Sequence, residues 1–368
     1  MGFRKNRTVR LINVLLIGLT LSSCSESTQE SPQKPEQSAQ SETPVNRDIN
    51  AEPATVDSRQ DNTPPLTNVY LGLAQQQFKS TCLAANQLGQ STQQFLSSPS
   101  ESGLAKVRSD WLTSHNLYSS TQLFRSISIK HPILDQSKTK PVEHSLAIRI
   151  DQTPLLPGYI DEVKGYPKSG YIFSTLPIDR DTLNKEHQFA DSAYVALGFH
   201  AIEFVLWGEN NRMVQEFSAL PAGQNKSNDI NSPDFFNSRR SQLLSLTTSI
   251  LIEDLNILCN EWKVETGYYA TTLKLLPTEE QIAAVNAATE QLISSIQIDM
   301  AKVRQANDDN MERIEVELHS AFSHSDNEDT LAKANILKSL IESKEWVEVS
   351  KKQEHTMKLT TLAQALLL

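Results

Sequence analysis

A histidine and a glutamate three residues apart are the part of this sequence best suited to chemistry. His200 and Glu203 lie in the run GFHAIEFVLWG, residues 198–208. On a helix, residues three apart project from nearly one face, so this imidazole and carboxylate can bind one cation together. The other side chains of the run are almost all apolar, which predicts a central, buried helix. A buried histidine and carboxylate must be paired or bind an ion, because leaving them unsatisfied is costly.

Spacing alone leaves two interpretations of this pair open. As a metal site, His200 and Glu203 supply only two of the four or more ligands required, so donors from other segments must complete it. As a structural pair, they bond to each other or to an arginine such as Arg240. Gly198, at the start of the run, allows another backbone or a ligand to approach closely.

Helices must position this motif, because apolar residues recur at spacings of three and four along most of the chain. One helix is expected over residues 71–97. A second begins at Ser98, with Pro99 and Glu101 completing a capping signal, and should pair antiparallel with the first. Further helices are expected over about 191–207, 232–262, 278–303 (with a Thr278/Gln281 capping box), 330–344 and 357–368.

Prolines and glycines interrupt the helical pattern between about residues 127 and 182, which predicts a long irregular segment of functional importance. Residues 267–277 have the character of a joint. The fold class is therefore predicted to be all-α, with two packed helical-bundle domains and a long irregular loop in the first. The expected boundaries are 66–266 for domain 1 and 267–368 for domain 2.

The first 23 residues have the layout of an export signal: a basic start, then an apolar run from Leu11 to Leu21 that is too short to span a bilayer. The run ends in Leu-Ser-Ser-Cys24, which is typical of a lipoprotein cleavage site, so Cys24 is the expected lipidation site. A plain signal peptide with an incidental cysteine is the alternative. Residues 24–65 are rich in Ser, Gln, Glu and Pro and are expected to form a disordered tether.

These features predict a protein on the periplasmic side of the cell envelope. Ser25, in place of an aspartate after the lipidated cysteine, favours the outer membrane by analogy with sorting in enteric bacteria. Cys82 and Cys259 would then lie in an oxidising compartment, where a disulfide and two separate buried thiols are both compatible with the sequence.

Composition narrows the function classes. The 368 residues carry a formal net charge of -10, with a pI near 5.4 and a mean hydropathy of -0.39. This excludes a polytopic membrane protein and opposes nucleic-acid binding, which needs a basic face. The sequence contains no P-loop, dinucleotide-binding glycine fingerprint, nucleophile elbow, CxxC pair or HExxH motif.

The run GFHAIEFVLWG, closed by Trp207 and Gly208, resembles the Gly-x-His-x-x-Glu signature of the imelysin family. The resemblance covers most of the chain after the tether. Its other elements are the loop at 157–170, Trp111, Arg239, Asp254, Trp262, and the segment 322–327 with Thr330 and Asn335, similar to Phe-Ser-Asp-Asn-Thr. This chain departs from the pattern by extra residues inside the last segment and by a short second domain.

The resemblance implies two helical bundles with a site at the cleft between them, in exported proteins tied to iron uptake, some of them described as peptidases. It implies that His200 and Glu203 bind a divalent or ferric metal ion, with Asp161 and Asp326 as further ligands. Supporting residues are Gly198, Trp207, Ser323, Asn327 and Arg240. His319 and His324 are either additional donors or exposed surface histidines.

The preferred function is a metal-binding component of iron uptake. Iron is favoured because carboxylates with one imidazole suit it, and zinc is the alternative. The expected partners are the membrane through the lipid anchor, a metal ion or iron carrier, and an iron transporter, with no nucleic acid. A metal-dependent peptidase and a non-catalytic interaction protein, in which the pair only fixes helix register, are the competing hypotheses.

Overall fold

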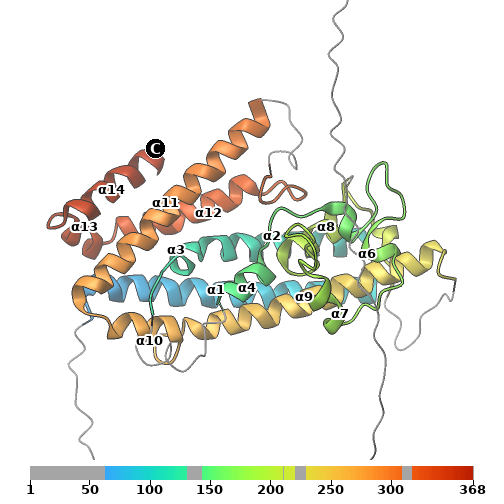
Figure 1. The fold of residues 1–368 in the computed structure, drawn as a ribbon, viewed down its shortest axis with the longest axis horizontal. Helices are drawn as coiled ribbons and strands as arrows, with labels where there is room; N and C mark the ends of the chain where they lie inside the picture. The colour runs from blue at the N-terminus through green and yellow to red at the C-terminus, as the bar shows by residue number, and fades with distance from the viewer. Residues whose placement is uncertain (1–62, 131–142, 210, 220–228, 309–316, 368) are drawn as a thin grey trace, which may run out of the picture. The chain divides into compact units, whose positions relative to one another are not determined.

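The computed structural model describes residues 63–130, 143–209, 211–219, 229–308 and 317–367 (Figure 1). The predicted signal segment, Cys24 and nearly all of the predicted tether lie outside these ranges. Arg59–Leu368 form one compact unit, and the predicted domain boundary at 266/267 stays a prediction. Regular structure in the described ranges is helical, apart from an isolated bridge between Val163 and Tyr166, so the all-α prediction is confirmed.

Three long helices form the frame of the molecule: α1 (Pro65–Ser97), α2 (Glu101–Ser120) and α9 (Pro233–Glu261). The expected antiparallel pairing of α1 and α2 is present. Gln77 and Thr81, in the middle of α1, donate to the carbonyl of Leu117 near the end of α2. A disulfide between Cys82 and Cys259 ties α1 to α9, which settles the alternative that the sequence left open.

The predicted cap of α2 was wrong by two residues. Ser100, rather than Ser98, accepts a hydrogen bond at its side chain from the backbone N–H of Gly103. The backbone of Ser98 instead closes α1, because its N–H donates to the carbonyls of Gln94 and Phe95. The helix α9 begins where predicted, and the Ser232 side chain caps it by accepting a hydrogen bond from the N–H of Phe235.

The motif helix α8 (Gly198–Trp207) is shorter than the predicted 191–207. The chain reaches it in an extended conformation at Leu197 and turns at Gly198, whose φ is +84°. This conformation, which ordinary side chains disfavour, separates residues 191–197 from the helix. Every residue from Gly198 to Leu206 is buried, and α8 packs against α2, α9 and α4.

The segment predicted as irregular contains short helices joined by turns. They are α4 (Glu143–Ile150), α5 (Pro157–Ile160), α6 (Gly170–Phe173) and α7 (Arg180–Glu186), and the short α3 (Gln122–Arg125) precedes them. A 3-10 turn, η2 (Val214–Glu216), follows α8. Residues 131–142 lie outside the described part of the chain.

The C-terminal helices are α10 (Tyr268–Leu275), α11 (Thr278–Asp308), α12 (Asp326–Ile341), α13 (Lys344–Ser350) and α14 (Glu354–Leu367). The predicted capping role of Gln281 was wrong. Its side-chain amide donates to the carbonyl of Leu276, so it closes the end of α10. The helix α12 begins four residues before the predicted Thr330, and it packs against both α2 and α11.

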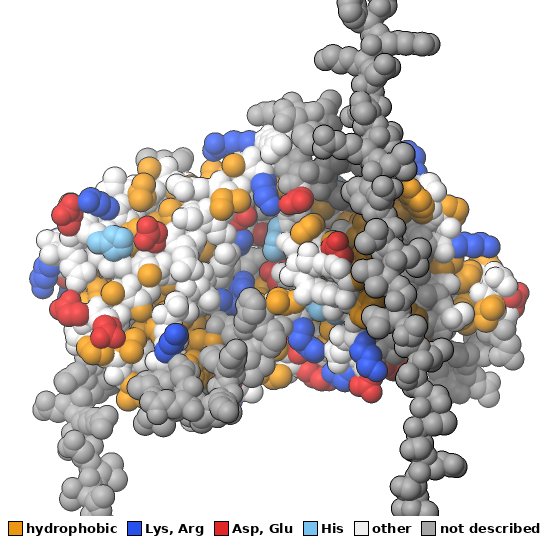
Figure 2. Space-filling model, in the orientation of Figure 1, with side chains coloured by type: hydrophobic (Ala, Val, Ile, Leu, Met, Phe, Trp, Pro, Cys, Tyr) orange, Lys and Arg blue, Asp and Glu red, His pale blue; other side chains and the backbone are white. Residues whose placement is uncertain are grey.

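The helix α9 is the one described helix long and apolar enough to cross a membrane, but half of that apolar stretch is buried inside the molecule. It also carries the buried charged residues Arg239, Arg240 and Asp254. Because α9 packs against α1, α4 and α8, it is a core helix. On the uncovered part of the face in Figure 2, basic and acidic side chains are interspersed.

Candidate metal centre

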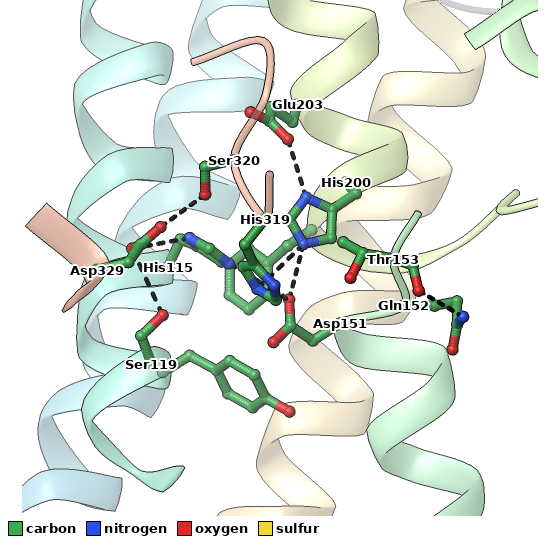
Figure 3. Close-up of polar contacts among 12 residues, drawn as sticks. His115, Ser119, Asp151, Gln152, Thr153, His200, Glu203, His319, Ser320 and Asp329 are labelled. Carbon is green, nitrogen blue, oxygen red and sulfur yellow. Dashed lines mark hydrogen bonds and ion pairs between the residues drawn. The ribbon is translucent and has the colours of Figure 1, made fainter. Parts of the chain in front are cut away.

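Four side chains from separate parts of the chain converge beside α8 (Figure 3). They are His115 of α2, Asp151 directly after α4, His200 of α8 and His319 before α12. Their candidate ligand atoms all lie within 4.8 Å of one another. The side chains of His115 and His200 are buried, Asp151 is 11% exposed and His319 is 28% exposed.

The three imidazoles present the same atom, Nε2, to one carboxylate oxygen. Asp151 Oδ1 lies 2.9 Å from His200 Nε2, 3.1 Å from His319 Nε2 and 3.3 Å from His115 Nε2. The Nε2 atoms of His200 and His319 are 3.4 Å apart. Metal–nitrogen bonds of about 2.0–2.1 Å in tetrahedral geometry place ligand atoms about 3.3 Å apart. These four separations, from 2.9 to 3.4 Å, are compatible with ligands around one first-row metal ion, and the remaining ligand atoms lie within 4.8 Å of one another.

Two of the imidazoles have a carboxylate behind them. Glu203 Oε2 lies 2.9 Å from His200 Nδ1, and Asp329 Oδ1 lies 3.1 Å from His115 Nδ1. At His200 this hydrogen bond holds a proton on Nδ1, so Nε2 can bind a cation once its own proton has left. At His115 the contact with Asp329 is an ion pair. The arrangement is that of metal-ligating histidines oriented by their outer partners.

The segment between α11 and α12 fixes these carboxylates, and we call residues 317–325 the site loop. Glu203 Oε1 accepts hydrogen bonds from the backbone N–H groups of Phe322 and Ser323 and from the Ser323 hydroxyl, at 3.1, 2.8 and 2.7 Å. Asp329 Oδ2 accepts from the Ser320 hydroxyl at 2.6 Å. The site loop therefore supplies His319 and also clamps the groups that orient His200 and His115.

Burial and charge act against each other at these histidines. Burial lowers the pKa of His200, but its hydrogen bonds with Asp151 and Glu203 outweigh this effect and raise the pKa to about 9. Burial also lowers the pKa of His115, but the Asp329 and Asp151 carboxylates outweigh this effect and raise the pKa to about 10. Without a cation both imidazoles hold a second proton at neutral pH, so an entering metal ion must displace protons.

Aromatic side chains fix the ring of His115. Trp111 stacks on it with ring centroids 4.7 Å apart, and Phe199 meets it edge-on at 4.9 Å. Trp111 is itself held, because its indole N–H donates to the carbonyl of Phe199 at 3.0 Å. The plane of one candidate ligand is thus set by packing as well as by Asp329.

Only part of the predicted ligand set comes together. His200 lies in the cluster, while Glu203 lies behind His200 as its hydrogen-bond partner. Asp161 is elsewhere: it is fully buried between Arg240 (2.6 Å) and Arg212 (2.9 Å). Arg240 therefore neutralises Asp161 and does not pair with the histidine and glutamate of α8.

Of the site residues predicted near α12, Asp326 and Ser323 support the centre, whereas others lie on the surface. Asp326 accepts from the backbone N–H of Ser320 at 2.9 Å, so it shapes the site loop. Ser323 binds Glu203, as described above, whereas Asn327 and His324 are exposed. Trp207 packs edge-on against Trp111 at 5.3 Å, which places it next to the wall of the centre.

Three residues of the centre were not singled out from the sequence: Asp151, His115 and Asp329. Asp151 follows a short helix in the segment predicted as irregular, and nothing in its neighbourhood marks it. His115 lies on the buried face of α2 with Trp111 and Tyr118. A histidine on a buried helix face, one turn after Trp111, is a signal that could have identified it.

These features define a helical protein with a buried histidine–aspartate centre. The chain belongs to the imelysin family: the family model described as imelysin (peptidase M75) matches residues 74–340. No curated protein matches the chain. A crystal structure from Parabacteroides distasonis ATCC 8503, whose name proposes an iron-regulated protein A precursor, is 14% identical with a TM-score of 0.44. That match covers 84% of this chain and 94% of the other.

Proposed function

We propose that this imelysin binds one divalent transition-metal ion with His115, Asp151, His200 and His319 as its ligands. The observation that carries the proposal is the convergence of three imidazole Nε2 atoms and one carboxylate oxygen in a largely buried place. Glu203 and Asp329 are positioning residues in this proposal, because each contacts a ligand and not the ion.

The donor set favours a divalent ion over a ferric one. The sequence suggested oxygen-rich ligation with one imidazole, but three imidazoles and one carboxylate converge here. Imidazole nitrogen suits iron(II), zinc, copper and nickel, whereas harder ions prefer oxygen. Iron(II) is the ion we propose, because imelysins are tied to iron uptake, and zinc is the competitor that the same donors would accept.

The cellular setting is also part of the proposal. The basic start, the apolar run and the Leu-Ser-Ser-Cys24 box support export and lipid anchoring, with the outer membrane favoured. The polar stretch 24–65 would hold the folded part away from the lipid surface. In this setting the protein would bind iron on the periplasmic side and pass it to a transporter.

Metal titration of purified variants tests the binding proposal. Wild type should bind one equivalent of iron(II) under anaerobic conditions, or of zinc. His115→Ala and Asp151→Asn should lose at least tenfold in affinity, because each removes or weakens one of four ligands. His324→Ala, which changes an exposed histidine of the same site loop, is the matched control and should bind as wild type does.

Circular dichroism of each variant separates loss of a ligand from loss of the fold. Wild-type affinity in both folded ligand variants would contradict the proposed centre. A purely structural cluster is a further outcome: added metal would then leave the thermal midpoint of wild type unchanged.

A further inference from the structure

A small cavity reaches the centre at His200 and His319. It is lined by His200 and His319, by Pro154 and Leu155 from the turn after Asp151, and by the site-loop residues Ala321 and Phe322, among others. His115 and Asp151 do not line it. The cavity therefore meets the edge of the centre between His200 and His319, whose Nε2 atoms are 3.4 Å apart.

The size of this cavity limits what it can hold. Its volume is about 20 Å³, and a single water molecule needs roughly 10–15 Å³ measured in this way. Pockets for organic ligands of drug size run to about 300–1,000 Å³. The cavity thus has room for about one water-sized ligand beside the centre.

The walls of the cavity are held in place. Phe322 packs edge-on against Phe204 of α8 with ring centroids 4.8 Å apart. The backbone N–H of Phe322 also donates to Glu203, which in turn holds His200. Enlarging the cavity at Phe322 would break these contacts, which also support His200 through Glu203.

We infer, on the basis of the proposed function, that the centre takes the free aquated divalent cation and leaves it one exchangeable water-sized ligand in this cavity. With four protein donors around the ion, one small ligand in the cavity would complete its coordination. A cation that arrives inside a chelate, such as ferric citrate, a siderophore or haem, does not fit and must be released from its carrier first. A peptide carbonyl with its flanking chain is excluded by the same walls.

Nitric oxide is a suitable probe, because it is a two-atom ligand that binds ferrous ions and gives them a characteristic EPR signal. The iron(II)-loaded wild-type protein should develop the ferrous nitrosyl signal on addition of nitric oxide. Ala321→Leu adds three carbon atoms to the cavity wall, and its bound iron(II) is measured first so that its nitrosyl signal is compared with wild type per bound ion. Its nitrosyl signal should be at least tenfold weaker at equal nitric oxide concentration.

The outcomes separate this inference from the proposed function. Absence of iron(II) binding by wild type would remove the proposed function itself. Iron(II) binding with no nitrosyl signal, or with an equal signal in Ala321→Leu, would leave the proposed metal site intact. It would contradict the exchangeable ligand position in the cavity.

A second measurement needs no variant. Wild type is titrated with ferric citrate and with haem, and the bound species is analysed for citrate and porphyrin. We expect no retention of either carrier. Retention of an intact chelate at one equivalent would refute the selection of the free ion.

Discussion

At the scale of single residues, the orientation of the imidazoles depends on two carboxylates that do not reach the centre. Glu203 lies one turn from His200 on the same helix, whereas Asp329 comes from a helix more than two hundred residues away from His115. Burial raises the pKa of Asp329, but the charge and hydrogen bond of His115 outweigh this effect and lower it. The carboxylate is therefore charged and forms an ion pair with the imidazole of His115.

Asp329→Asn should weaken metal binding without removing a ligand. An amide oxygen can still accept from His115, but the amide lacks the negative charge that makes the imidazole a better metal ligand. Outer partners of this kind contribute about 10–100-fold in metal affinity. Isothermal titration with zinc measures the change. Glu328→Gln, an exposed acidic residue next to it in α12, should bind as wild type, and equal affinities for both variants would contradict the role of Asp329.

At the scale of elements, α8 is positioned by a close backbone crossing with the end of α4. A Cβ atom at Gly198 would lie 2.4 Å from the carbonyl oxygens of both Arg149 and Ile150. Asp151 follows these two residues directly, so the crossing sets the distance between Asp151 and His200. The glycine of the Gly-x-His-x-x-Glu motif is thus explained by backbone packing.

Gly198→Ala should destabilise the protein by about 3 kcal/mol, because a side chain there meets two backbone carbonyls and a left-handed conformation. Gly72→Ala in α1 is the control, since a Cβ there meets nothing within 4 Å. That change should be neutral or stabilise by roughly 0.5–1 kcal/mol. Urea unfolding followed by circular dichroism measures both, and similar midpoints would argue against the tight crossing.

At the scale of the whole molecule, acid stability depends on a histidine outside the centre. The Nε2 atom of His187 lies 3.1 Å from the carbonyl of Ile148, while its Nδ1 accepts from the backbone N–H groups of Ala196 and Leu197. Burial lowers the pKa of His187 to about 4, from 6.5 in an exposed histidine. Protonation of His187 Nδ1 would place a charged N–H next to the backbone N–H donors of Ala196 and Leu197, directly before α8.

Because the folded pKa lies below the unfolded one, the contribution of neutral His187 to stability is complete above pH 6.5 and is lost as the pH falls to about 4. The loss should amount to about 3 kcal/mol at most. His187→Gln, which keeps a donor and an acceptor but does not titrate, should flatten the pH dependence of unfolding between these values. Parallel pH curves of unfolding for variant and wild type would show that His187 does not contribute to the loss of stability in acid.

The sequence by itself determined what depends on neighbours along the chain. The helical periodicity predicted α1, α2, α8, α9, α11 and α12, and the apolar run around His200 correctly indicated burial. The imelysin resemblance rested on contiguous motifs, and the family match confirmed it. The errors in the predicted helices lie at helix ends such as Ser98 and residue 191. One side-chain contact or one dihedral angle decides where such a helix begins.

Tertiary structure alone decided which donors share the centre. Asp161 and Arg240 each had the right chemistry, but packing brings them to each other, because a buried carboxylate needs a cation and a guanidinium was within reach. Asp151 and His319 come from loop segments whose paths no periodicity constrains. Ligand geometry depends on distances between residues far apart in sequence, and those distances exist only after the helices have packed.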